Sequence, residues 1–131
     1  MLGRTALIIN VAAWGTLSAA QEIAVPSGHL VTVLDTRIVT GAQGETLHLR
    51  VLMPQIDRQG DAVSYDEVAG DFAALCDGLG IPVIDKAGVD PDAITVTLLS
   101  AEAPFGQTTP GITKFSESFG VEAGRCIWEA L

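Results

Sequence analysis

The chain has 131 residues, with 16 acidic and seven basic side chains, and its formal net charge at pH 7 is −9. This length fits a single domain with a modest core. Nucleic acids and anionic membranes attract Lys and Arg, so the acidic balance argues against nucleic-acid binding. The sequence has no glycine-rich phosphate loop and no other cofactor motif, so we expect no cofactor.

The first 20 residues have the three parts of a secretory signal peptide. The first segment, residues 1–4, is short and carries the positive charge of Arg4. Residues 5–17 are uncharged and mostly apolar, and residues 18–20 have small side chains. This pattern predicts cleavage before Gln21, export of the chain and a single domain over residues 21–131. Cleavage would remove Arg4 and leave six basic and 16 acidic residues, a formal charge of −10.

A membrane anchor is the alternative interpretation of the same segment. A spanning helix needs about 20 apolar residues, whereas residues 5–17 are followed at once by small and then polar residues. No second segment is long enough to span a bilayer. We therefore expect no membrane span in the mature chain.

Residues 29–39 and 45–53 are rich in β-branched and apolar side chains, and two glycines lie between them in residues 41–44. This pattern predicts an antiparallel hairpin. If Thr40 pairs with Glu45, one face carries Leu34 opposite Val51, Thr36 opposite Leu49, and Ile38 opposite Leu47. A shift by one residue would mix the two faces, so the pattern favours this register.

The same register gathers polar side chains on the other face of the hairpin. Asp35 lies opposite Arg50, and Arg37 lies opposite His48. We hypothesise that this patch binds an acidic group of a partner or ligand, with Arg37 and Arg50 as bidentate donors and His48 as a pH-dependent group. The alternative is a solvated sheet face whose charge pair contributes about 0.2–1 kcal/mol.

Residues 64–79 have the pattern of an amphipathic helix. Ser64 is a candidate N-cap, and Glu67 three residues later completes a capping box. Apolar side chains recur on one helical face: Tyr65, Val68, Phe72, Leu75, Cys76 and Leu79. Gly80 and Pro82 predict that the helix ends directly after this segment.

The C-terminal half predicts two further strands. Residues 93–99 alternate between apolar and polar side chains, and residues 125–129 form a short terminal strand with Cys126 and Trp128 on one face. Residues 101–111 predict a loop, while residues 112–119 fit either a helical turn or a strand. The fold class is therefore α+β, an antiparallel sheet of about four or five strands with one main helix on one face.

The sequence contains only weak indications of a metal-binding or catalytic site. Asp85, Asp90 and Asp92 offer oxygen ligands that Ca²⁺ accepts, but their spacing is not that of an EF-hand and also suits an ordinary turn. We predict no metal site. Ser27 is close to His29 but lacks the nucleophile elbow of hydrolases, so the sequence identifies no catalytic residue.

The leading functional interpretation is a non-enzymatic interaction or structural module with an unknown protein partner. A small periplasmic hydrolase that uses carboxylates is one alternative, and an inhibitor of a secreted enzyme is another. No nucleophile–base pair, metal cluster or cofactor motif distinguishes an enzyme.

The chain contains two cysteines, Cys76 and Cys126. In an oxidising compartment an even number favours a disulfide, although two buried thiols remain the alternative. The spacing excludes a CxxC redox motif.

Two short stretches resemble a known family. Phe115, Phe119 and the ending Gly124-x-Cys126-Ile127-Trp128-Glu129 are similar to a group of small exported alphaproteobacterial proteins catalogued as a domain of unknown function. Residues 71–76 (DFAALC) fit the same group. The resemblance implies a periplasmic location and a pairing of Cys76 with Cys126, and it carries over no catalytic residue.

Overall fold

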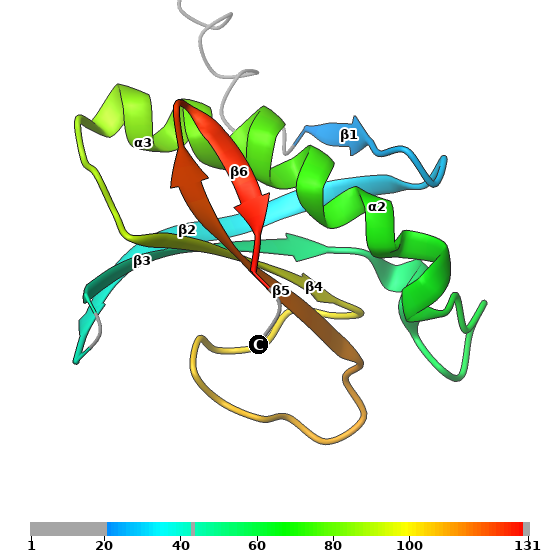
Figure 1. The fold of residues 1–131 in the computed structure, drawn as a ribbon. Coiled ribbons are helices and arrows are strands. Elements are labelled where there is room, and N and C mark those ends of the chain that lie inside the picture. The colour runs from blue at the N-terminus through cyan, green and yellow to red at the C-terminus, as the bar shows by residue number, and fades with distance from the viewer. Residues whose placement is uncertain (1–20, 43, 130–131) are drawn as a thin grey trace, which may run out of the picture.

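The computed structural model describes residues 21–42 and 44–129. Within these residues, six strands form one sheet in the order β1-β2-β3-β4-β5-β6. The sheet curls into a half-barrel with the helices along one side (Figure 1). The strands are β1 (Glu22–Ala24), β2 (Leu30–Gly41), β3 (Gly44–Leu52), β4 (Ala93–Leu99), β5 (Lys114–Glu122) and β6 (Arg125–Trp128).

The predicted α+β class is confirmed, but the expected purely antiparallel sheet is wrong. Strands β3 and β4 are parallel, and every other neighbouring pair is antiparallel. A parallel pair needs a crossover, and the helical segment between β3 and β4 provides it. The strand missing from the prediction is β1, where Ile23 pairs with Val31.

The β2–β3 hairpin follows the predicted register over most of its length. Thr40 pairs with Glu45, Asp35 with Arg50, and Arg37 with His48. The predicted pairing of Leu34 with Val51 is wrong, because a bulge between Val33 and Asp35 places Val33 opposite Val51 instead. A bulge inserts one extra residue on one strand and shifts every later pair.

The helix α2 (Tyr65–Leu75) begins as predicted. The Glu67 amide donates to Ser64 Oγ at 3.3 Å, and the Ser64 amide donates to the Glu67 carboxylate at 2.9 Å. Both halves of the capping box are therefore present, and they fix the entry of the chain into the crossover.

The predicted end of this helix is wrong. The chain continues through a π-helical turn, η2 (Cys76–Gly80), into a second helix, α3 (Ile81–Ala87). Proline is tolerated in the first turn of a helix, because the backbone N–H that it lacks has no partner within the helix at that position. Pro82 lies in the first turn of α3. The left-handed C-cap is Gly88, with a φ of 69°.

Gly80 has a packing role in place of the predicted terminal one. A Cβ atom at this position would lie 3.3 Å from two side-chain carbons of Ile94. The glycine therefore lets the π-helical turn approach β4 closely.

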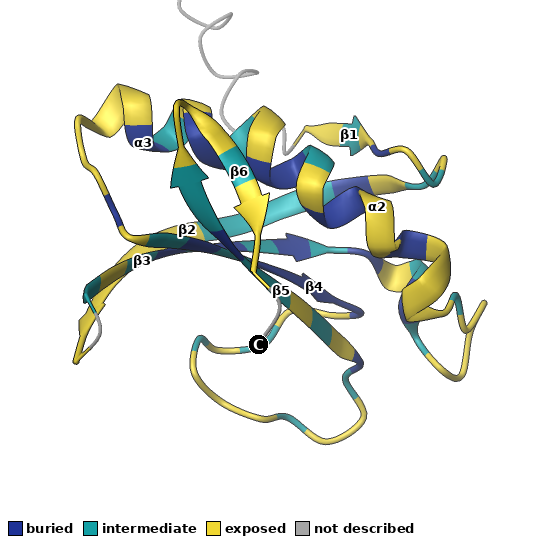
Figure 2. Ribbon diagram, in the orientation of Figure 1, coloured by how far each residue is buried: buried dark blue, intermediate teal, exposed yellow. Residues whose placement is uncertain are grey.

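The core lies between the helices and the face of the sheet that they cover (Figure 2). The sheet contributes alternate residues, which are Leu47, Leu49 and Val51 from β3 and Ile94, Val96 and Leu98 from β4. The helical segment contributes Val68, Phe72, Leu75, Ile81 and Ile84. The opposite face of the sheet, which α2 and α3 leave uncovered, is called the outer face below.

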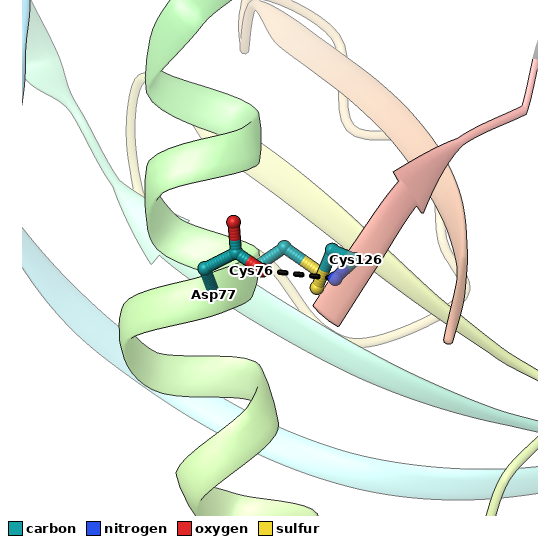
Figure 3. The surroundings of a disulfide bond; sticks show 3 residues. All are labelled: Cys76, Asp77 and Cys126. Atoms are coloured by element: carbon teal, nitrogen blue, oxygen red, sulfur yellow. Dashed lines mark hydrogen bonds between the residues drawn. A yellow bond between two sulfur atoms is a disulfide. The ribbon is translucent and has the colours of Figure 1, made fainter. Parts of the chain in front are cut away.

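Cys76 and Cys126 form a disulfide whose Cα atoms lie 6.2 Å apart (Figure 3). The bond ties the start of the π-helical turn to the edge strand β6. Asp77 reinforces the same junction, because its carboxylate accepts a 2.9 Å hydrogen bond from the Cys126 amide. The segment 112–119, which the sequence leaves ambiguous, belongs largely to β5.

Two predictions concern membranes and export. In residues 21–42 and 44–129, no helix has the length and apolar character needed to cross a bilayer. The predicted signal peptide, residues 1–20, lies outside the described residues.

Candidate functional site

The outer face carries two adjacent rows of polar side chains that cross four strands. Strand pairing places them side by side. One row is Asp35, Arg50, Thr97 and Ser116; the next is Arg37, His48, Thr95 and Ser118. Side chains on adjacent strands at matched positions lie within contact distance, so the predicted patch is one end of a larger polar surface.

Hydroxyl groups complete the far end of both rows. Thr95 Oγ1 and Ser118 Oγ lie 2.9 Å apart, and Thr97 Oγ1 and Ser116 Oγ lie 3.0 Å apart. Each hydroxyl can donate one hydrogen bond and accept others. The surface therefore offers hydroxyl donors and acceptors beside the charged groups.

Arg50 is held by contacts within the protein. Its Nε and Nη2 atoms donate to the two carboxylate oxygens of Asp35 at 2.8 and 2.6 Å, and Nη1 donates to the Ala103 carbonyl at 2.6 Å. The hydrogen bond from Arg50 lowers the pKa of Asp35, although partial burial opposes this shift. The hypothesis from the sequence uses Arg50 as a bidentate donor to a ligand. Because Nε and Nη2 of Arg50 already donate to Asp35, this guanidinium is unavailable for that role.

The loop between β4 and β5 places Phe105 over the patch. The guanidinium carbon of Arg37 lies 4.3 Å from the ring centroid, and that of Arg50 lies 5.6 Å from it. The His48 ring meets the same ring edge-on, with centroids 5.1 Å apart. Phe105 therefore joins three of the four predicted patch residues. Sequence reasoning missed Phe105, because nothing in a loop indicates which side chain folds back on a sheet.

His48 is half-buried, and burial lowers its pKa below the ordinary value of 6.5; the positive charge of Arg37 lowers it further. At neutral pH the imidazole is therefore uncharged, with one donor and one acceptor nitrogen. It acquires a positive charge only in more acidic solution.

A hollow of about 190 Å³ adjoins the patch. It is lined by His48, Arg50, Thr97, Phe105, Lys114 and Ser116, among others. Lys114 is exposed and lies opposite Leu99 at the start of β5. Sequence reasoning missed Lys114, and the β4–β5 register would have been needed to place it here.

The other sequence candidates do not converge on a site. Asp85 lies in α3, while Asp92 accepts a 2.9 Å hydrogen bond from the Glu45 amide. In the described part of the chain, no three His, Cys, Asp or Glu side chains are grouped to hold a metal ion. Ser27 donates both its amide and its hydroxyl to the buried carboxylate of Asp71, at 2.9 and 2.6 Å, so its hydroxyl links a loop to α2.

Comparison with known proteins identifies the family. Residues 9–131 match a family of unknown function, DUF6497. The chain belongs to this family. This match confirms the predicted resemblance to a family catalogued as a domain of unknown function. No curated protein and no solved structure gives a significant match.

Proposed function

We propose that this chain is an exported, non-enzymatic binding module that holds an acidic group of a partner or ligand on the outer face of its sheet. The single observation that carries the proposal is the position of basic groups on a chain of formal charge −9. Arg37, Arg50 and Lys114 lie on one surface with His48 and Phe105.

The internal pairing of Arg50 refines which groups meet the ligand. Arg50 holds Asp35 and the loop, whereas Arg37 and Lys114 are exposed. Phe105 supports the guanidinium of Arg37 from one side by a cation–π contact, and a guanidinium stacked on a ring still directs its N–H groups outward in its own plane, where a carboxylate can accept them. The hydroxyl groups of the two rows supply neutral donors beside that charge.

Binding of an acidic group is expected to depend on Arg37. In a titration with a hexaglutamate peptide followed by NMR, we expect shifts at His48 and Arg37 and none with hexaglutamine. Arg37→Ala is expected to weaken hexaglutamate binding by about tenfold, because a charge-assisted hydrogen bond is lost.

Arg125→Ala is the matched control, since it removes one exposed positive charge from the edge strand β6. Equal weakening by both variants would mean that only net charge matters and would contradict a site at Arg37. Equal binding of the two peptides by the unaltered protein would reject recognition of an acidic group altogether.

The exported location is supported by the signal-peptide pattern of residues 1–20 and by the Cys76–Cys126 disulfide, since such bonds persist in oxidising compartments. Protein recovered from its host is expected to begin near Gln21. Intact-mass spectrometry under non-reducing conditions checks this directly. A mass that includes Arg4 would exclude cleavage at the predicted position.

A further inference from the structure

A second pocket lies on the helix side of the sheet, between α2 and the β5–β6 hairpin. Its volume is about 270 Å³. Its walls are mostly aromatic and apolar, and Glu117 is the one charged residue among the lining residues, which include Tyr65, Ala69, Phe72, Phe119 and Trp128. It is separate from the surface around Arg37, because Glu117 lies opposite Val96, whose side chain faces the core.

Glu117 is held between two aromatic donors. The Tyr65 hydroxyl donates to one carboxylate oxygen, and Trp128 Nε1 donates to the other at 2.7 Å. The hydrogen bond to Glu117 raises the pKa of Tyr65 to about 12, because removing the phenolic proton would leave two negative charges in contact. Both polar aromatic groups are thus turned toward the same negative charge.

This arrangement leaves the pocket with a carboxylate and aromatic faces but without a free side-chain donor among the lining residues. The hydroxyl of Tyr65 and the indole N–H of Trp128 are already used, and the remaining walls are apolar. An anionic or acceptor-rich ligand would find no donor there. A ligand that brings positive charge and apolar surface matches both features of the pocket.

The pocket is accessible from solvent. Trp128 is 58% exposed and Tyr65 is 37% exposed, although both are large aromatic residues. Tyr65 contacts Phe72 and Phe115 with ring centroids 5.7 and 5.8 Å away, so its orientation is fixed by packing. Rigid, exposed aromatic faces next to a carboxylate are suited to cation–π contacts.

We propose that this pocket binds a quaternary ammonium group. A primary ammonium has three N–H donors that need acceptors, whereas Glu117 is the one charged acceptor in the lining, and its bonds to Tyr65 and Trp128 leave it about two lone-pair sites. A quaternary ammonium has no donor to satisfy, and its methyl groups contact the aromatic faces. A divalent metal ion would need several oxygen ligands, and the pocket lining supplies one carboxylate.

Choline is the probe, and 3,3-dimethyl-1-butanol is its neutral counterpart of the same shape. The mature chain, which begins at Gln21, is titrated with each, and binding is followed by calorimetry and by the indole N–H signal of Trp128 in NMR. Trp128 is the one tryptophan in residues 21–131, so its indole signal is assigned directly. Choline is expected to shift the Trp128 signal and to bind at least about tenfold more tightly than the neutral alcohol.

Nα-acetyl-lysine N-methylamide, whose ε-nitrogen is a free primary ammonium group, tests the preference for a quaternary ammonium. It is expected to bind more weakly than choline. Equal or tighter binding of this compound would overturn the assignment, as would equal binding of the neutral alcohol or an unchanged Trp128 signal at saturating choline.

Glu117→Gln keeps the size of the side chain and removes its charge, and it is expected to weaken choline binding by about tenfold. Glu122→Gln is the control, because Glu122 is an exposed acid on the same strand outside the pocket. Equal effects of the two variants would also overturn the assignment. Trp128→Leu, which keeps an apolar side chain without an aromatic face, should reduce the difference between choline and the alcohol, while Glu117 and Tyr65 still favour choline.

Discussion

Removing the disulfide between Cys76 and Cys126 is expected to lower the free energy of unfolding by about 4 kcal/mol. The two cysteines are 50 residues apart in sequence, so the bond closes a long loop in the unfolded chain and reduces its conformational entropy. The native state also loses its covalent link between the π-helical turn and β6. For a domain of this size, such a loss lowers the melting temperature by roughly 15 °C.

The variant for this test is Cys76→Ala with Cys126→Ala, compared with the unaltered chain by thermal and denaturant unfolding. The unaltered protein in reducing agent is the matched control, since it keeps both side chains and lacks only the bond. The alanine variant and the reduced protein both lack the disulfide and are expected to melt at similar temperatures. If the oxidised protein melts within about 3 °C of them, the disulfide does not stabilise the fold to the extent that chain entropy predicts.

The hairpin shows how far the sequence alone determines structure. Alternation between apolar and polar side chains fixes which residues share a face, so the pairing of Asp35 with Arg50 and of Arg37 with His48 was predictable. The bulge at Leu34 was not. The extra residue reverses the phase of the alternation, so Val33 lies opposite the core residue Val51 while Asp35 lies opposite Arg50. Adjacent apolar residues at this point do not show which of them is the extra one. Local pattern therefore predicted the polar pairs correctly but not the register beyond the bulge.

The crossover helix shows the opposite limit. Gly80 and Pro82 are frequent after helix ends, and that local signal predicted a stop. In the structure Gly80 is packed against Ile94 of β4, and Pro82 lies at the start of α3. Gly80 and Pro82 can either end a helix or lie within a continued one. Tertiary packing decides between these outcomes, and it cannot be inferred from the local sequence.

The additional site residues depend on the same kind of information. Lys114 joins the outer face only through the pairing of β5 with β4, and Phe105 reaches it through a loop held by Arg50. The carboxylate of Glu117 meets Tyr65 and Trp128 across 52 and 11 residues of sequence. None of these contacts follows from periodicity within one segment.

The geometry of the outer face depends on Arg50. Replacing Arg50 is expected to lower the free energy of unfolding by the largest amount after removal of the disulfide. The Arg50 side chain is 12% exposed and makes three hydrogen bonds, two to Asp35 and one to Ala103. Arg50→Met keeps most of the apolar stem and removes all three bonds. We expect a loss of about 2–3 kcal/mol in the free energy of unfolding, because a partly buried carboxylate is left unpaired.

Arg58→Met is the matched control, since it removes one exposed positive charge from a turn and is expected to change stability by less than about 0.5 kcal/mol. A double-mutant cycle with Asp35→Asn isolates the pair. The double variant is expected to be more stable than the sum of the two single losses implies, with a coupling of about 1–2 kcal/mol after allowance for the partial exposure of Asp35. Additive losses would contradict a direct ion pair.

The same pair predicts how stability depends on pH. Arg50 lowers the pKa of folded Asp35 below its ordinary value of 3.8, so ionised Asp35 stabilises the fold at pH values above 3.8. That stabilisation is lost as the pH falls through the lowered pKa of the folded state. The difference in unfolding free energy between the unaltered chain and Arg50→Met should therefore be constant from pH 7 to about pH 5 and shrink in more acidic solution. A difference that stays constant down to pH 2 in denaturant titrations would show that Arg50 acts through packing and its bond to Ala103, without an electrostatic contribution from Asp35.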